Sequence, residues 1–159
     1  MRKLWNRPSV PVWSLVTRDT DGNINMNICT YVTSISLQPK LMLIALYTGT
    51  KTLKNVLETK QGLLQLLTEE LAPVVRVCGR TTGHTTDKIA RLKKRYLLSE
   101  VDDFLYFTQA AGYVTLSFKD VISTEGDHML AIAEVIHTKN LNDLPLLTTD
   151  YLKKHKFVR

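Results

Sequence analysis

Cysteine is scarce in this sequence, which has two thiols, Cys29 and Cys78, among its 159 residues. So few thiols exclude a disulfide-bonded scaffold and suit a reducing compartment, and we therefore expect a cytoplasmic protein. Long apolar runs are missing too. No stretch reaches the roughly 18 residues of a membrane-spanning helix, and the basic N-terminus lacks the apolar segment of a secretory signal. We expect no membrane partner.

Motifs for dinucleotides, triphosphates and metals are also absent. No G-x-G-x-x-G occurs, which excludes a Rossmann dinucleotide site. The string TGTKT, residues 48–52, has Thr50 where a P-loop requires a glycine before the lysine, so that motif is excluded as well. The two cysteines and four histidines show no metal-ligand spacing, and we expect no metal site.

The charge and the length indicate what kind of partner and domain to expect. The formal charge of +6, from 21 basic and 15 acidic residues, favours an anionic partner such as nucleic acid, a membrane surface or a phosphorylated small molecule. With 44% hydrophobic residues and no linker or repeat, residues 1–159 are expected to form one domain. Five basic residues crowd one expected helix: Lys88, Arg91, Lys93, Lys94 and Arg95. Because only Tyr96 is interleaved with them, a solvated helix face is favoured over a nucleic-acid patch.

The stretch Ile24–Pro39 has the alternation of a half-buried strand. Its even positions are apolar and its odd positions polar: Ile24, Met26, Ile28 and Val32 against Asn25, Asn27, Cys29, Tyr31 and Thr33. Such a pattern predicts a strand with one face in a core and the other lined by hydrogen-bonding groups. The parity then reverses, with Ile35 and Leu37 apolar. We therefore predict a backbone break near Thr33–Ser34, beside which a small polar ligand could bind.

The remaining pattern is rich in strands. Further strands are predicted at Val12–Thr17, Leu41–Tyr47, Leu63–Leu67, Phe104–Thr108, Tyr113–Thr124 and Met129–Thr138, with Asp21-Gly22 as a hairpin turn. Helices are predicted at residues 51–60, from Pro73 to about Cys78, at Asp87–Leu98 and in the tail Asp150–Arg159, with Gly62 ending the first. Many strands with a few helices predict a β-rich α+β domain such as a barrel.

Three local features are candidates for chemistry, each with a plain alternative. The hydroxyl-rich turn before the helix at residue 51 suits an anion, although capping by Thr50 or Thr52 is the favoured interpretation. Cys29 is a lone thiol that reads better as a small buried hydrophobe than as a nucleophile. His128 follows Gly126-Asp127 in a tight connection, where a turn residue and a site residue are equally consistent.

An ordered set of motifs resembles the flavin reductase-like proteins, which have an FMN-binding split-barrel fold. Asn27–Pro39 followed by LMLIALY resembles their signature N-x-M-T-x-S-x-x-x-S-V-S-x-D-P-P and the apolar strand after it, with Asn27-Ile28 and Pro39-Lys40 as departures. Three later segments also match in order: Thr50-Lys51-Thr52-Leu53 before a helix, Thr82-Gly83 with Asp87-Lys88-Ile89 as S-G-x-x-x-D-K-F, and Gly126-Asp127-His128 with Glu134-Val135 as G-D-H-x-L-x-x-x-E-V. The resemblance covers roughly residues 10–140.

The resemblance implies an FMN site. The residues that would edge the isoalloxazine ring are Cys29, Thr30, Tyr31, Val32, Thr33 and Ser34. Thr50, Lys51 and Thr52 would hold the phosphate, and Lys88 would reach over the flavin. His128 would line the face open to a hydride donor, which makes it the one catalytic candidate.

The resemblance also implies a function and an assembly. The leading hypothesis is an FMN-binding oxidoreductase, a flavin reductase that takes hydride from NAD(P)H and passes it to free flavin or an acceptor protein. The alternative is a flavoredoxin-like electron carrier with tightly bound FMN and no direct use of NAD(P)H. A non-enzymatic basic barrel that binds nucleic acid is the least favoured alternative. The family implies a homodimer with FMN near its interface.

Overall fold

A seven-stranded antiparallel sheet is the centre of the fold. The computed structural model describes residue 4 and residues 7–158. The strands of the sheet are β1 (Trp13–Arg18), β2 (Ile24–Cys29), β3 (Val32–Leu37), β4 (Lys40–Tyr47), β5 (Gln61–Leu66), β8 (Gly112–Ile122) and β9 (His128–Asn140). Their order is β2-β1-β5-β8-β9-β4-β3, so the sheet is open, with β2 and β3 at its two edges. The predicted β-rich α+β class is confirmed.

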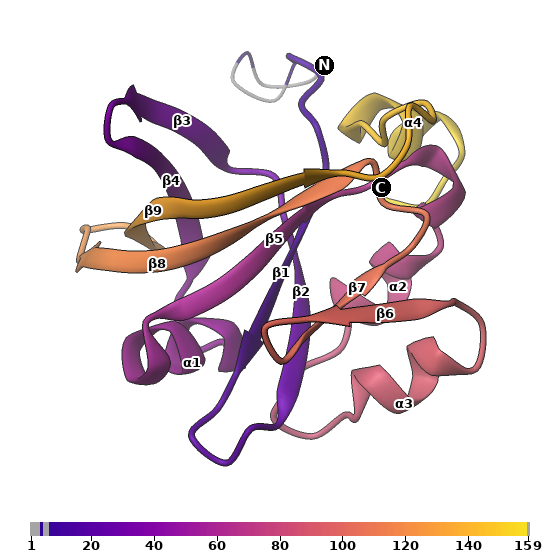
Figure 1. Cartoon of the computed structure of the whole chain (residues 1–159). Helices are drawn as coiled ribbons and strands as arrows, with labels where there is room; N and C mark the ends of the chain where they lie inside the picture. The colour runs from indigo at the N-terminus through magenta and orange to yellow at the C-terminus, as the bar shows by residue number, and fades with distance from the viewer. Residues whose placement is uncertain (1–3, 5–6, 159) are drawn as a thin grey trace.

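The remaining elements flank this sheet. They are α1 (Lys51–Thr59), the 3-10 turn η2 (Glu69–Leu71), α2 (Val74–Cys78), α3 (Lys88–Lys93), the hairpin β6 (Leu98–Val101) with β7 (Phe104–Phe107), and α4 (Thr149–Lys154). Figure 1 shows α1 beside the lower ends of the sheet strands, with α2, α3 and the β6–β7 hairpin on the opposite flank. Among the described residues, no helix is long and apolar enough to cross a bilayer.

Two apolar clusters form the core. The first includes Met26, Leu63 and Phe107 and lies between the sheet and the flanking elements α2, α3 and β6–β7. The second includes Ile44 and Leu116 and lies inside the curve of the sheet, against α1. The curve of the sheet therefore gives β2 a buried environment on both of its faces.

The predicted continuous strand from Ile24 to Val32 is wrong, because β2 ends at Cys29 and β3 begins at Val32. Ile28 packs against the first core cluster, whereas Val32 packs against the second. The two residues between β2 and β3, Thr30 and Tyr31, connect one edge strand of the sheet to the other. Apolar residues therefore continue at even positions across this link, although those before it pack against the first core cluster and Val32 packs against the second. The predicted parity reversal corresponds to a bulge between Ser34 and Ser36, where β3 pairs with β4.

Several helix boundaries also differ from prediction. Helix α1 ends at Thr59 and is capped by Lys60, which adopts a left-handed conformation (φ 57°), while Gly62 lies inside β5. Helix α3 ends at Lys93 rather than Leu98. The strand β6 that follows was not predicted, and Leu98 pairs there with Phe107 of β7. The tail helix α4 is likewise shorter than expected and ends at Lys154.

Candidate functional site

The turn between β4 and α1 holds a capped helix start. The Thr50 Oγ1 atom accepts a hydrogen bond from the Leu53 backbone N–H at 3.2 Å and donates one to the Tyr47 carbonyl at 2.9 Å. The capping interpretation is therefore confirmed for Thr50. The first N–H groups of any α-helix have no intrahelical acceptor, so this end of α1 keeps a partial positive charge.

Thr52 points into the interior rather than toward solvent. It is only 1% exposed, and its Oγ1 accepts a hydrogen bond from the Asn25 amide of β2 at 3.0 Å. One helical turn later, buried Asn55 donates to Thr17 of β1 at 3.1 Å. These buried polar contacts fix α1 on the β1–β2 hairpin, so the Thr52 hydroxyl is occupied within the protein.

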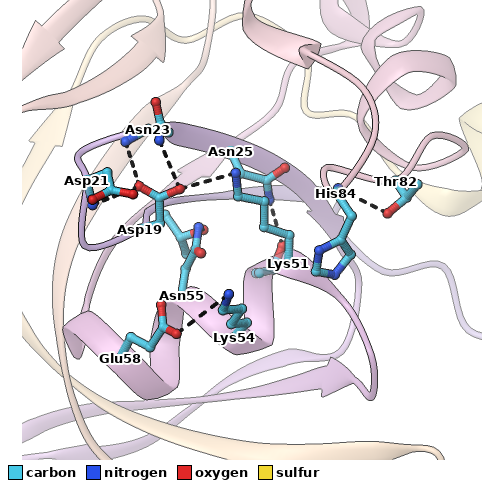
Figure 2. Close-up of polar contacts among 12 residues, drawn as sticks. Asp19, Asp21, Asn23, Asn25, Lys51, Lys54, Asn55, Glu58, Thr82 and His84 are labelled. Carbon is cyan, nitrogen blue, oxygen red and sulfur yellow. Dashed lines mark hydrogen bonds and ion pairs between the residues drawn. The ribbon is translucent and has the colours of Figure 1, made fainter.

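Lys51 forms an ion pair with the first hairpin. Its Nζ atom lies 3.3 Å from Asp19 Oδ2, and both side chains are about four-fifths covered. Burial alone would raise the pKa of the Asp19 carboxyl, but hydrogen bonds from Asn23 together with the Lys51 contact lower that pKa below its usual value. Figure 2 shows Asp19, Asn25 and Lys51 gathered over the start of α1.

A cavity of about 690 Å³ opens beside Lys51. Its walls come from the β1–β2 turn, the start of α1, the loop 79–87 and α3, including Asn25, Lys51, His84 and Lys93. The loop fits closely against the sheet, because a Cβ atom on Gly83 would overlap Asn25 Oδ1. His84 Nε2 lies 3.2 Å from the Gly49 carbonyl oxygen and so joins this loop to the β4–α1 turn.

Lys88 is buried at the base of the same loop. Its ammonium donates to the carbonyl of Met26 in β2 at 3.0 Å and to the carbonyl of Cys78 in α2 at 2.9 Å. Burial lowers the pKa of this lysine, because the charged form loses solvation. Lys88 therefore connects α3 to β2 and α2, and this anchors one end of the loop beside Lys51.

Three rings meet at the other side of the β4–α1 turn. The His128 ring lies edge to face with Tyr31 and with Tyr47, at centroid separations of 5.4 and 5.3 Å. His128 Nδ1 is 2.6 Å from Asp127 Oδ1, while Tyr31 and Tyr47 are 59% and 53% exposed. The β2–β3 link, the end of β4 and the start of β9 thus present an accessible aromatic surface, which we name the three-ring surface.

The other predicted ring-contacting residues are spread over two environments. Cys29 is buried in the second core cluster, where loss of solvent raises its pKa to about 12, so its interpretation as a small buried hydrophobe is confirmed. Val32 is half-buried against the same cluster, and Thr30 is half-buried in the link. Thr33 and Ser34 are exposed on the edge strand β3. Of this set, Tyr31 is the one whose ring contacts that of His128.

Sequence reasoning missed Tyr47, Asp19 and Asn25. Tyr47 is the last residue of a predicted apolar strand, and this pattern indicates a core residue. Its position next to a polar turn is the signal that burial ends there. Asp19 lies next to the predicted Asp21-Gly22 turn without being singled out, and Asn25 is one member of the predicted polar strand face. Their partners Lys51 and Thr52 are more than 25 residues away along the chain, so no local pattern reports the contacts.

Comparison with known proteins gives a consistent family and fold. A family model described as "Flavin reductase like domain" matches residues 6–153. A search of curated proteins finds no match. Among solved structures, the NADH:FAD oxidoreductase SgcE6 of Streptomyces globisporus C-1027 aligns with a TM-score of 0.80 at 15% identity, covering 92% of this chain and 84% of that one.

Two further structures share the fold. An FMN-binding protein from Thermus thermophilus aligns with a TM-score of 0.74 at 15% identity, covering 88% of this chain and 75% of that one. A protein from Sinorhizobium meliloti 1021 aligns with a TM-score of 0.78 at 21% identity, covering 91% of this chain. The present chain spans about half of the Sinorhizobium protein, 48% of its length. The predicted split-barrel fold is confirmed.

Proposed function

This chain belongs to the flavin reductase-like family, and from that premise we propose that it is an oxidoreductase that binds FMN and takes hydride from NADH or NADPH. We propose that residues 1–159 form one such domain. The two cysteines are both free and buried, and we place the protein in the cytoplasm on that basis. The reduced FMN would pass its electrons to free flavin or to an acceptor protein.

The observation that carries the proposal is the convergence of three distant segments. Tyr31, the turn at Thr50 and His128 lie far apart in sequence, yet contacts link them. The His128 ring contacts the rings of Tyr31 and Tyr47, and the Tyr47 carbonyl accepts a hydrogen bond from Thr50. The result is an exposed aromatic surface that the β4–α1 turn joins to a positively polarised helix end, whose first residue is Lys51. Planar aromatic ligands that carry a phosphate need these two features together.

The residues present fit an FMN molecule. Lys51 and the first N–H groups of α1 would hold the phosphate, as a point charge and as backbone donors. Tyr31 and His128 would lie along the isoalloxazine ring, which supplies the two-electron chemistry when bound. Asp127 Oδ1 accepts a hydrogen bond from the Nδ1–H of His128 in the tautomer that leaves Nε2 unprotonated, and this Nε2 would be available to a ligand.

We further propose that the protein is a homodimer with the site near the interface. The outer face of β4 and β9 presents the half-buried apolar residues Leu41, Leu43, Ala45, Leu130 and Ile132. Leu43 pairs with Ile132 and Ala45 with Leu130, so they form one contiguous patch, and none of them belongs to either core cluster. Such patches on soluble proteins mark interaction surfaces. The adjoining pair, Tyr47 and His128, belongs to the three-ring surface.

A spectrum and a binding titration test the flavin assignment. Purified protein with added FMN should show bound flavin after dialysis, and stopped-flow mixing with NADH or NADPH should bleach it. Protein that stays colourless and binds no FMN would rule out both the reductase and the electron carrier. If neither nucleotide bleaches the bound flavin, the reductase hypothesis fails and the electron-carrier hypothesis takes its place.

Substitution of Lys51 tests the phosphate assignment. Lys51→Met should weaken FMN binding by about tenfold, the size of one partly screened charge interaction, while riboflavin binding should change little. Thr52→Ala is unsuitable for this purpose, because the Thr52 hydroxyl bonds to Asn25 inside the protein. Equal losses for FMN and riboflavin would mean that Lys51 does not contact the phosphate.

A further inference from the structure

The cation assigned to the phosphate already has an anionic partner within the protein. Lys51 lines the 690 Å³ cavity, yet its ammonium lies 3.3 Å from the Asp19 carboxylate. Figure 2 shows this pair above the first turn of α1. A phosphate that binds Lys51 must share or displace that carboxylate.

Asp19 is held in place by its own turn. Its Oδ1 accepts from the backbone N–H groups of Asp21 and Asn23 at 3.1 and 2.8 Å. Its Oδ2 accepts from the Asn23 side-chain amide at 3.2 Å and faces Lys51. These contacts stabilise the charged carboxylate and orient it, so the negative charge stays beside Lys51 when a ligand arrives.

We propose that Asp19 determines how tightly this site holds a phosphate monoester, by competing with the phosphate for Lys51. The inference rests on the proposed function, in which Lys51 contacts the phosphate of FMN. Two anions share one ammonium, and the fixed carboxylate repels a phosphate that carries nearly two negative charges at neutral pH. Asp19 thereby weakens phosphate-bearing ligands selectively, whereas a neutral ligand such as riboflavin is not affected.

Asp19→Asn separates this effect from the folding of the turn. The asparagine oxygen still accepts from the two backbone N–H groups. The amide nitrogen replaces the oxygen that faces Lys51, and only the hydrogen bond from the Asn23 side chain to that oxygen is lost from the turn. FMN should then bind about tenfold more tightly, the effect expected of removing one nearby charge, and riboflavin should bind as before. Affinities are measured by fluorescence titration at constant ionic strength.

Asp21→Asn is the matched control. Asp21 is an exposed carboxylate in the same turn, and its substitution changes the net charge equally. It should alter FMN affinity by less than about twofold, because its side chain is open to solvent and strongly screened. In a Lys51→Met background, Asp19→Asn should give a smaller selective gain for FMN over riboflavin, because the competition for the cation is gone and only the direct repulsion between carboxylate and phosphate remains.

The outcomes are separable. If the native protein binds neither FMN nor riboflavin, the proposed function fails, and the inference fails with it. If FMN binds but Asp19→Asn leaves its affinity unchanged or lowers it, only the inference about Asp19 is overturned. Equal tightening by Asp21→Asn also overturns it. Thermal midpoints without ligand establish that each variant is folded, and Asp19→Ser replaces Asp19→Asn if the latter does not fold.

Discussion

Two thiols in the core show how strongly burial alone changes the chemistry of a residue. Burial raises the pKa of both Cys29 and Cys78 to about 12, against 9.0 for a free thiol. The native protein should therefore react slowly with a thiol reagent at pH 8, and both groups should react at once in denaturant. A thiol that reacts faster than the protein unfolds would contradict this burial.

The same shifts predict how stability depends on pH. Because the folded pKa values are raised, the folded state retains thiol protons that the unfolded state releases between pH 9 and about 12. This contribution to the free energy of unfolding is fully present below pH 9 and is lost as the pH rises toward 12. Urea denaturation across this range, compared with a Cys29→Ala, Cys78→Ala double variant, measures it. A difference between the two proteins that does not change with pH would rule the linkage out.

Lys88 tests the cost of leaving buried carbonyls without a donor. Lys88→Met keeps the aliphatic stem but removes the ammonium that serves Met26 and Cys78. We expect a loss of about 2 kcal/mol in the free energy of unfolding, the usual range for unsatisfied buried groups being about 1–3 kcal/mol. Exposed Lys93 on the same helix is the control, and Lys93→Met should stay within about 0.5 kcal/mol. Similar losses for both variants would mean that the two carbonyls do not depend on Lys88.

Single residues were predictable where their environment is local. The cap at Thr50 follows from a hydroxyl just before a one-sided apolar stripe. The burial of Cys29 follows from the usual preference of a lone thiol for the interior, although the strand alternation places it on the polar face. The burial of Lys88 could not be predicted, because five basic residues crowd one helical segment and only the fold determines which of them faces β2. The exposure of the Tyr47 ring could not be predicted, because the apolar run that precedes this residue indicates burial.

At the scale of elements, the start of α1 depends on one hydroxyl. Thr50→Ala removes the acceptor for the Leu53 N–H and should cost about 1 kcal/mol of stability, whereas Thr50→Ser keeps the cap and should cost much less. Thermal unfolding of the two variants side by side makes the comparison. An equally large loss in Thr50→Ser would assign the effect to the threonine methyl group.

The loop 79–87 depends on a close approach at Gly83. In Gly83→Ala the new Cβ would overlap Asn25 Oδ1, so the loop must shift, and we expect a loss of about 1–3 kcal/mol. Gly126→Ala is the control, because the nearest atom to its Cβ would be Thr124 Oγ1 at 3.5 Å, an ordinary contact. Urea denaturation curves should separate the two variants. If they coincide, the loop is not held against Asn25.

Elements were predictable where one periodicity corresponds to one buried face. The helix α1 follows this rule, and the predicted positions of the strands β1, β4 and β9 are also close to those in the structure. The link at Thr30–Tyr31 could not be found, because the alternation continues while the strand passes from one core cluster to the other. Strand β6 was missed because its only partner is β7, and the preceding helical pattern extended over its first residue.

At the scale of the whole molecule, the apolar patch on β4 and β9 should determine the oligomeric state. Light scattering after gel filtration should give twice the mass of one chain for the native protein. Ile132→Glu should give monomers, because an unpaired charge in a buried interface is costly. Leu57→Glu, at an exposed position on α1, should leave the dimer intact. A native protein that elutes as a monomer, or a dimer that survives Ile132→Glu, would refute this interface.

The order of strands in the sheet has a consequence for how the chain is built during translation. The hairpins β1–β2 and β3–β4 are complete once residue 47 is made, and only two residues join them. Their places in the sheet are nevertheless held apart by β5, β8 and β9, and β4 pairs with β9 at residues 128–134. Until the last strand leaves the ribosome, β4 therefore lacks a partner on one side, and assembly must wait for contacts of long sequence separation. A nascent chain arrested before β9 would present that strand edge to other chains and aggregate.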